Sequence, residues 1–206
     1  NSVGASDGAN ETTRFRLPVT EAYPYRHRID FTAYDKAETL TNFPLLVTFH
    51  PLRPGWNYSR FLSPNGYDLR FTTEDEGQFL SYEIEEWNTN GNSYVWVNVP
   101  ELAAGSAVWA CLGNPDDDIR FPPAYAVDGT AWNSGYLGVW HFAETEWSLR
   151  DSTTNAVFAK VRAMDPGDGS MGFKTNVGVV GIGRRSSDYF HGSPDQHTCL
   201  VVTNPA

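Results

Sequence analysis

The sequence is poor in positive charge, in sulfur-containing residues and in long apolar runs, and these shortages remove whole classes of protein. Its 206 residues carry 15 lysines and arginines against 25 aspartates and glutamates, a formal net charge of −10. Proteins that bind nucleic acids concentrate lysine and arginine on one face, so this balance argues against a nucleic-acid partner. No apolar run approaches the ~18 residues that a membrane-spanning helix needs. We therefore expect a soluble chain without membrane insertion.

The short motifs of common catalytic centres are also missing. Five histidines occur, but none stands in an HExxH pattern or beside a cysteine at metal-ligand spacing. There is no Gly-x-Ser-x-Gly nucleophile motif and no phosphate-binding Gly-x-x-x-x-Gly-Lys loop. Zinc and nucleotide chemistry are therefore not indicated. The only two cysteines, Cys111 and Cys199, allow either one disulfide or two buried thiols.

What the sequence does have is aromatic residues, glycine and proline, in a pattern typical of β-structure. It contains 7 Trp, 10 Tyr and 12 Phe beside 18 Gly and 13 Pro. Short alternating runs separated by turn-forming residues occupy residues 25–34, 43–50, 67–73, 79–87, 93–102 and 106–113. Six strands at this spacing predict an all-β fold, an antiparallel β-sandwich of the jelly-roll kind.

Two further parts flank this predicted sandwich, which we assign to residues 22–120. Residues 1–21 form a polar leader, except that Phe15, Leu17 and Val19 alternate with polar neighbours and predict an edge or donor strand over 13–20. A connector over 121–136 leads to a second set of β-like runs in 137–206, which are GYLGVWHF, GVVGIGRR and TCLVV. This second set is short for a complete sandwich, so we expect it to be partial or completed by a partner.

Several motifs in order resemble one bacterial family. They are FPLLVTF (43–49), SPNGYDLRFT (63–72), SYEIEEWN (81–88), VWVNVPEL (95–102) and the closing LGNP (112–115). Together they are similar to the domain of unknown function 2341 over about residues 22–120. The resemblance implies an extracellular or periplasmic, mostly β module without an established activity.

A second resemblance begins at Gly138. The stretch GVWHF (138–142), followed by DSTTN (151–155) and VGIG (180–183), is similar to the opening of laminin-G-like, or concanavalin A-like, sandwiches. Such domains often follow the first family in secreted multidomain proteins. The resemblance implies a second β-domain that begins within 137–206.

Glu83 and Glu85 are the sharpest candidates for chemistry. On a strand they project to one face together with Trp87, about 7 Å apart along the chain. Paired carboxylates beside an aromatic platform are what glycosidases use. Laminarinase-like sandwich enzymes carry a similar strand, but here Trp87 stands where their second catalytic glutamate would be. We therefore favour a solvated strand face, or contact with a ligand, over catalysis.

Other polar side chains have more structural interpretations. Asp68 and Arg70 share one face of a strand, and we expect an ion pair between them or between Arg70 and the glutamates of the neighbouring strand. The oxygen-rich loop with Asn114, Asp116 and Asp118 is a candidate partial calcium site, as is a second loop with Asp165, Asp168 and Ser170.

Exposed aromatic rings would give a sandwich a carbohydrate-binding surface, because sugar rings stack on them. Trp96, Trp109 and Trp140 lie in apolar runs and are expected in the core. The candidates for ligand contact are Trp56, Tyr58, Trp87 and Trp132.

Two functions from different classes remain open, with a glycan-cleaving enzyme as a weaker third. One is a secreted, non-catalytic module for adhesion or for binding a glycan or another surface polymer, with calcium as the only cofactor to consider. The other is a structural subunit of an extracellular filament or coat, in which copies of the chain join by donating the 13–20 strand.

Overall fold

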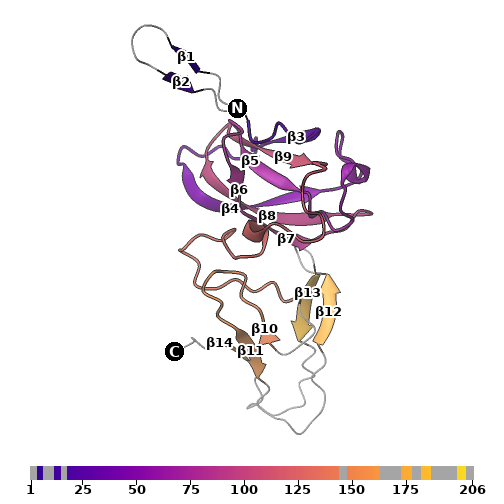
Figure 1. Ribbon diagram of the computed structural model, residues 1–206. Coiled ribbons are helices and arrows are strands. Elements are labelled where there is room, and N and C mark those ends of the chain that lie inside the picture. Colours follow the sequence, from indigo (N-terminus) through magenta and orange to yellow (C-terminus); the bar gives the residue numbers. More distant parts are fainter. Residues whose placement is uncertain are drawn as a thin grey trace, which may run out of the picture.

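Two antiparallel sheets pack face to face and form a β-sandwich (Figure 1). The computed structural model describes residues 4–6, 12–14, 18–143, 148–162, 173–177, 182–186 and 199–202. The four-stranded sheet has the order β3 (Tyr25–Asp30), β9 (Ala107–Leu112), β5 (Arg70–Thr73) and β6 (Phe79–Leu80). The three-stranded sheet has the order β4 (Leu40–Phe49), β8 (Ser93–Leu102) and β7 (Tyr82–Glu86). The predicted all-β sandwich is confirmed.

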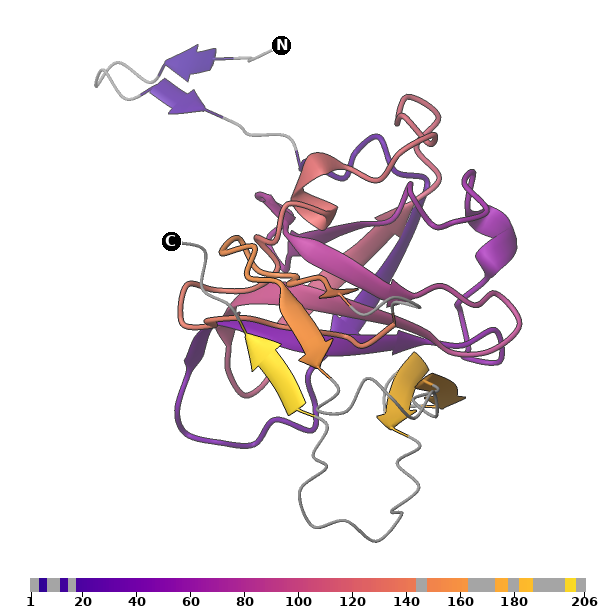
Figure 2. The ribbon, with the colours of Figure 1, turned by 90° about the horizontal axis from the view of Figure 1, so that it is seen from below.

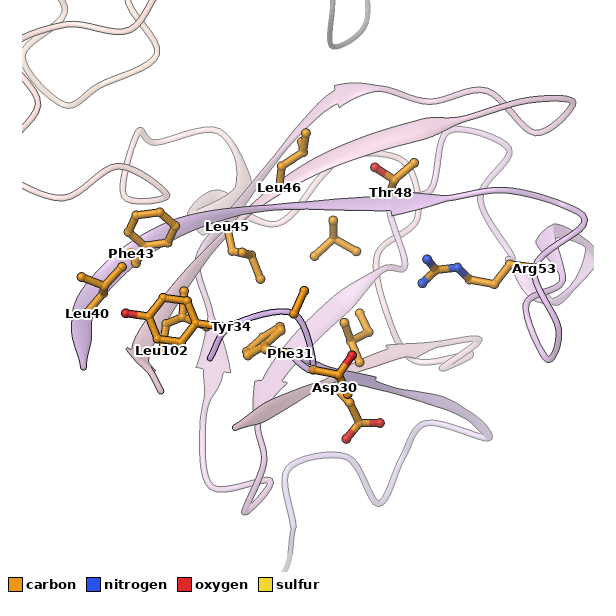
Figure 3. A pocket seen from close by; sticks show the side chains of 14 residues that line it. Asp30, Phe31, Tyr34, Leu40, Phe43, Leu45, Leu46, Thr48, Arg53 and Leu102 are labelled. Carbon is orange, nitrogen blue, oxygen red and sulfur yellow. The ribbon is translucent and has the colours of Figure 1, made fainter. Parts of the chain in front are cut away.

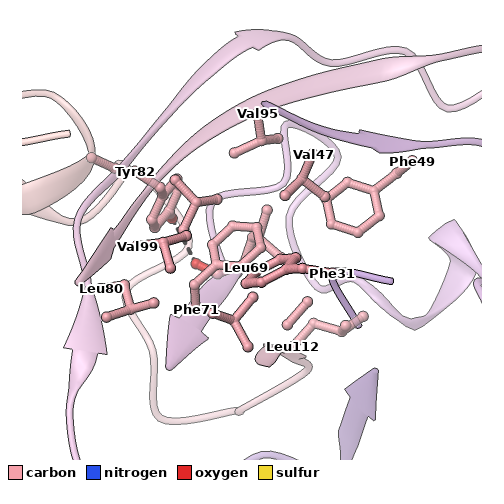
Figure 4. Packing of buried hydrophobic residues seen from close by; sticks show 14 of the residues in the cluster. Phe31, Val47, Phe49, Leu69, Phe71, Leu80, Tyr82, Val95, Val99 and Leu112 are labelled. Carbon is pink, nitrogen blue, oxygen red and sulfur yellow. Dashed lines mark hydrogen bonds between the residues drawn. The ribbon is translucent and has the colours of Figure 1, made fainter. Parts of the chain in front are cut away.

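The core lies between the sheets and follows the period of two in the sequence. In β8, Val95, Val97 and Val99 are buried while the residues between them are partly exposed. They meet large side chains of the opposite sheet, among which Phe71 is fully buried (Figure 4). Each such side chain stabilises the folded state by about 1.5–3 kcal/mol relative to exposure.

The two sides of the sandwich differ. On one side the chain passes directly from β6 to β7, and Ser81 is the residue at which it changes sheets. The backbone N–H of Asn98 donates to the Ser81 carbonyl (2.9 Å), which holds this corner against β8. On the other side the edge strands β3 and β4 border the sandwich, and among the described residues no further strand pairs with them.

The other described strands form three smaller sheets. They are the hairpin of β1 (Gly4–Ser6) and β2 (Thr12–Arg14), the sheet of β10 (Ser148–Leu149), β11 (Ala159–Arg162) and β14 (Cys199–Val202), and the pair of β12 (Phe173–Val177) and β13 (Ile182–Ser186). Strands β11 and β14 lie side by side (Figure 2), and Figure 1 shows both below the sandwich. Two single-turn 3-10 helices, η1 (Tyr58–Arg60) and η2 (Ala124–Ala126), lie in loops. Within the described ranges, no helix is long and apolar enough to cross a membrane.

Two of the predicted strands differ from the structure. Val19 lies in a turn, where its N–H donates to the Glu76 carbonyl (3.1 Å), so the strand predicted over 13–20 does not extend to its end. Phe15 and Leu17 lie outside the described residues. The run 135–142 forms no strand, because the N–H of Val139 donates to the Asp151 carboxylate (2.9 Å) instead of to a ladder.

Candidate functional site

Glu83 and Glu85 meet on the outer face of β7, where a later segment of the chain covers them. The Nδ1 atom of His141 lies 2.5 Å from Glu85 Oε2, and its Nε2 atom lies 3.5 Å from Glu83 Oε2. The Glu85 and His141 side chains are 6% and 17% exposed, so this ion cluster is largely withdrawn from water. We call the three residues the Glu–His clamp.

Hydrogen-bond donors from three parts of the chain bind both oxygens of Glu83 and the Oε2 atom of Glu85. The indole N–H of Trp132 donates to Glu83 Oε2 (2.6 Å), and the Ser152 hydroxyl donates to Glu83 Oε1 (2.7 Å). The indole N–H of Trp96, on β8, donates to Glu85 Oε2 (2.7 Å). Charge-assisted bonds of this kind are about twice as strong as neutral ones. The glutamates therefore act as acceptors that gather side chains far apart in sequence.

Burial and ion pairing have opposite effects on the pKa values of the clamp residues. Burial alone would lower the pKa of His141, but the hydrogen bonds and charges of Glu83 and Glu85 outweigh it and raise that pKa to about 9. Burial would raise the pKa of Glu83, whereas the bonds from His141 and Trp132, with the imidazolium charge, bring it below its usual value. At neutral pH the clamp therefore holds an imidazolium between carboxylates.

The segment that supplies Trp132 crosses the outer face of the three-stranded sheet. The Thr130 hydroxyl donates to the Ser81 hydroxyl (2.8 Å), and the Asn98 amide donates to the Thr130 carbonyl (3.3 Å). The Asn133 amide donates to the carbonyl of Asn42 (2.8 Å), at the start of β4. These bonds, together with the bond of Trp132 to Glu83 of the clamp, hold this segment against the sandwich.

Asp151 organises the loop that carries Ser152. Its buried carboxylate accepts the backbone N–H groups of Val139, Thr153 and Val157, each at 2.9 Å. Gly129 packs against the same loop with a positive φ of 84°, and a Cβ atom there would lie 2.7 Å from the Thr153 backbone. Only glycine fits this close approach, which sets where the loop meets the sandwich.

A pocket of about 390 Å³ opens at the clamp, and Glu83 and Glu85 are among the residues that line it. Tyr67 and Trp87 supply half-buried aromatic walls, and Asn65 and Arg150 supply exposed polar groups. Arg150 donates to the Val127 carbonyl (3.3 Å), which holds its guanidinium at the rim. An amphipathic ligand can contact both aromatic side chains and hydrogen-bonding groups here.

Two of the four aromatic residues predicted to contact a ligand are buried instead. Trp56 is 5% exposed because its indole stacks on Phe49, with ring centroids 3.9 Å apart, and the prediction of an exposed ring there is wrong. Trp132 is 7% exposed because its indole N–H points inward and donates to Glu83 of the clamp. Tyr58 and Trp87 are half-buried and pack against each other edge to face, 5.3 Å apart. Only Trp87 of this set lines the pocket.

The expected ion pair between Asp68 and Arg70 does not form. The buried Asp68 carboxylate accepts backbone N–H groups from Leu62 (2.9 Å), Ser63 (3.0 Å) and Gly113 (3.1 Å), which use its lone pairs. Arg70 pairs with Asp117 (2.9 Å) instead, and carries its charge away from both glutamates of β7. Asp68 lies in the turn before β5 and Arg70 is the first residue of the strand, so the two residues do not share a strand face as predicted.

The Asp117 carboxylate joins two more parts of the chain. It accepts the Tyr23 hydroxyl at 3.1 and 3.2 Å, just before β3 begins, and the Asn114 amide at 3.2 Å, just after β9 ends. Together with Arg70 it therefore connects the segment just before β3 to the segment just after β9.

Two of the three residues predicted to bind calcium, Asn114 and Asp118, have side-chain oxygens with protein partners. Asn114 Oδ1 accepts the N–H of Asp116 (3.1 Å), and the Asp118 carboxylate is bound by the Arg120 guanidinium (2.9 Å). No group of three or more histidine, cysteine or acidic side chains in the described ranges is arranged to hold a metal ion. The partial calcium site at Asn114, Asp116 and Asp118 therefore stays a prediction, and the partners of Asn114 and Asp118 do not support it. Asp165, Asp168 and Ser170 lie outside the described residues.

Cys111 is a free, buried thiol in β9, so the alternative of a disulfide with Cys199 is excluded for this structure. Burial raises the pKa of the Cys111 thiol to about 12. A protonated, enclosed sulfur atom is chemically inert, which makes it part of the core.

Sequence reasoning missed His141, Ser152, Tyr67 and Arg150. Nothing local marks them, since His141 and Ser152 meet Glu83 across 58 and 69 positions of sequence. The available signal was the run of apolar and aromatic residues GYLGVWHF, which indicates a segment that packs against another part of the chain.

Comparison with known proteins adds one finding. No curated protein and no solved structure matches the chain. A family model described as Domain of unknown function (DUF2341) matches residues 65–131, and this match places strands β5 to β9 and both glutamates of the clamp within that family's sequence pattern.

Proposed function

We propose that the chain is a non-catalytic module of an extracellular surface, which binds a glycan or a similar hydroxyl-rich polymer in the pocket at the clamp. The observation that carries this proposal is the lining of that pocket. Tyr67 and Trp87 line it with aromatic side chains, and Asn65 and Arg150 line it with an amide and a guanidinium group. Sugars present apolar C–H faces and hydroxyl groups together, so walls of this mixed kind match them.

The bonding of the glutamates supports binding without catalysis. A general acid or base must reach a proton on the substrate. Both oxygens of Glu83 already accept protein donors, and Glu85 Oε2 accepts two. The clamp is therefore better suited to hold the pocket wall in place than to transfer protons.

We further propose that residues 137–206 form the opening of a laminin-G-like β-domain, joined to the sandwich of residues 22–120 by the connector 121–136. The Asp151-centred loop and the antiparallel pairs β10–β11–β14 and β12–β13 support this division. A secreted location and a role in adhesion accord with such an arrangement of β-modules.

Binding can be tested with an array of polysaccharides and with calorimetry on any that is retained. We expect Tyr67→Ala to lower affinity about tenfold, because one lost aromatic contact amounts to about 1–1.5 kcal/mol. Tyr94→Ala removes a partly exposed tyrosine that does not line the pocket, and should leave affinity unchanged. Equal effects of the two variants, or retention of no polymer, would contradict the proposal.

Catalysis is tested separately by incubating the protein with the same polysaccharides and measuring new reducing ends. We expect no turnover above the level of the double variant Glu83→Gln with Glu85→Gln. Turnover that this double variant abolishes would make the chain an enzyme.

A further inference from the structure

A second cavity lies between the edge strands β3 and β4, and it shares no lining residue with the pocket at the clamp. Its volume is about 440 Å³, which is in the range of cavities that hold small molecules. We call it the β3–β4 groove. A ligand of this groove is distinct from the proposed glycan, so its binding goes beyond the proposed function and is independent of it.

The groove is apolar along most of its length (Figure 3). Phe31 and Leu102 line it and are only 8% and 2% exposed, and Phe43 lines it from β4. Its lining continues along β4 to Thr48, about 16 Å from Phe43 at the rise of a β-strand. A volume of about 440 Å³ over such a length gives a narrow groove. This shape suits one extended alkyl chain better than a fused ring system.

Tyr34 lies at the apolar end of the groove, beside Leu40 and Phe43 (Figure 3). Its hydroxyl donates to the carbonyl of Glu38 (3.1 Å), which holds the ring against the loop between β3 and β4. Desolvation and then the Glu38 carboxylate raise the pKa of Tyr34, so a negative charge lies near this end. An anionic group on a ligand is therefore disfavoured here.

Arg53 lies at the opposite end of the groove. Figure 3 shows its guanidinium directed toward the middle of the groove. Its backbone N–H donates to the His50 carbonyl (2.9 Å), which holds the turn after β4. Within the part of the chain that the structure describes, the Arg53 guanidinium has neither an ion pair nor a hydrogen bond. This cation is therefore available to an anionic ligand.

Two neighbouring side chains add to the cationic character of this end. Burial and then the charges of Arg53 and Arg60 lower the pKa of His27, so both guanidinium groups lie within electrostatic reach of this β3 residue. Arg60 is held in place, because its guanidinium lies over the Tyr25 ring (4.9 Å) and donates to the Gly55 carbonyl (3.3 Å). The local charge is thus opposite to that of the chain as a whole.

The nearby acids have partners of their own. Asp30 lines the groove but pairs with Arg28, and Asp35 pairs with Lys36 (3.1 Å). The net charge of −10 repels a dianion more strongly than a monoanion. A guanidinium binds a carboxylate through two parallel N–H···O bonds. Arg53 is therefore suited to a ligand with a single carboxylate.

We propose that the β3–β4 groove binds a single-chain amphipathic carboxylate of the fatty-acid class. The alkyl chain lies against Phe31, Phe43 and Leu45, and the carboxylate binds the Arg53 guanidinium. Because Arg53 is exposed, the head group stays at the surface while the chain leaves water for the apolar wall.

Calorimetric titration of the full chain with dodecanoate and dodecanol, both below their aggregation limits, tests the head group. Dodecanoate should bind wild type about tenfold more tightly than dodecanol, which has the same chain without the charge. Arg53→Gln should weaken dodecanoate about tenfold and leave dodecanol unchanged. Lys36→Gln makes the same change of charge at an exposed residue outside the groove wall, and should bind like wild type. Absence of dodecanoate binding, or equal binding by wild type and Arg53→Gln, overturns the proposal.

A second pair of variants tests the alkyl chain. Leu45→Ser should weaken dodecanoate and dodecanol alike, whereas Leu52→Ser, at a leucine that is 83% exposed and outside the groove, should change neither. If Leu45→Ser fails to fold by near-ultraviolet circular dichroism, Tyr34→Ser replaces it at a half-buried lining position.

Two further outcomes would overturn the proposal. Dodecanoate that binds the folded groove variant as tightly as wild type occupies another site. A dimer in sedimentation that the groove variant disrupts and dodecanoate does not dissociate would assign the groove to a second copy of the chain.

Discussion

At the scale of single residues, His141 shows how one side chain can hold two parts of a chain together. Its imidazolium sits between carboxylates that would repel each other without it. Removing one partner of a largely buried ion cluster leaves charge uncompensated and is strongly destabilising. The contribution of the clamp to the free energy of unfolding therefore depends on the protonation of His141 and on the ionisation of Glu83.

This dependence predicts a pH profile. Because the folded pKa of His141 is raised from 6.5 to about 9, its contribution is full below pH 6.5 and is lost as the pH rises through 9. Glu83 has a lowered pKa, so its contribution is full above pH 4.5 and is lost on acidification below that value. We expect His141→Gln to cost about 2–3 kcal/mol at pH 6 and little at pH 10. Urea unfolding of both proteins at the two pH values measures this, and a constant difference would contradict it.

Asp68 supports a second prediction at this scale. Asp68→Asn replaces an acceptor of three N–H groups by an amide that must turn a donor toward at least one of them. We expect a loss of about 2 kcal/mol of unfolding free energy. Asp116→Asn changes an exposed carboxylate to the same amide and should stay within about 0.5 kcal/mol of wild type. Denaturant midpoints compare them, and similar losses would show that the Asp68 bonds matter little.

At the scale of elements, the local alternation of side chains was enough to predict a β-run at each strand of the sandwich. It was not enough to predict their pairing. The run 79–87 reads as one strand, yet it divides at Ser81 between two sheets, because that corner depends on the bond from Asn98 in β8. The run 135–142 reads as a strand as well, but Asp151 takes its backbone donor at Val139.

The docking of the Asp151 loop on the sandwich can be tested with two glycines. Gly129 and Gly105 have nearly the same positive φ, 84° and 81°, but a Cβ atom meets backbone at 2.7 Å only at Gly129 and nothing within 4 Å at Gly105. Gly105→Ala should cost about 1–2 kcal/mol from the backbone conformation alone. Gly129→Ala should cost more and displace the loop that carries Ser152. Thermal melts and amide exchange at Ser152 report this, and equal losses would argue that the contact is easily relieved.

At the scale of the whole molecule, much of the candidate site could not be predicted because it depends on the third dimension. Glu83 and Glu85 were recognisable as a pair, since they share a strand face. That they are covered depends on His141 and Trp132, and nothing in the sequence around these two residues indicates that they lie against β7. The sequence also suggests Asp68 or the two glutamates as the partner of Arg70. Its partner in the structure is Asp117, which comes close to Arg70 only when the chain folds.

The enclosure of Cys111 predicts how the molecule opens. In a Cys199→Ser background, the Cys111 thiol should react with a disulfide reagent only as fast as the sandwich unfolds, because burial and a pKa of about 12 suppress the native thiolate. Increasing the reagent concentration should bring the rate to a plateau equal to the unfolding rate. A rate that keeps rising in proportion to the reagent would indicate local access to β9.

The bonds of Asp117 to Tyr23 and Arg70 affect how this sandwich would respond to a pulling force. Tyr25 and Leu112 are partners in the β3–β9 ladder, so the chain enters and leaves the domain at the same end of one strand pair. Tension between these two points peels the pair apart one hydrogen bond at a time, which is the mechanically weak direction. The bonds of Asp117 to Tyr23 and Arg70 lie across that end and are loaded first. The tensile strength of the domain would therefore rest on a single carboxylate.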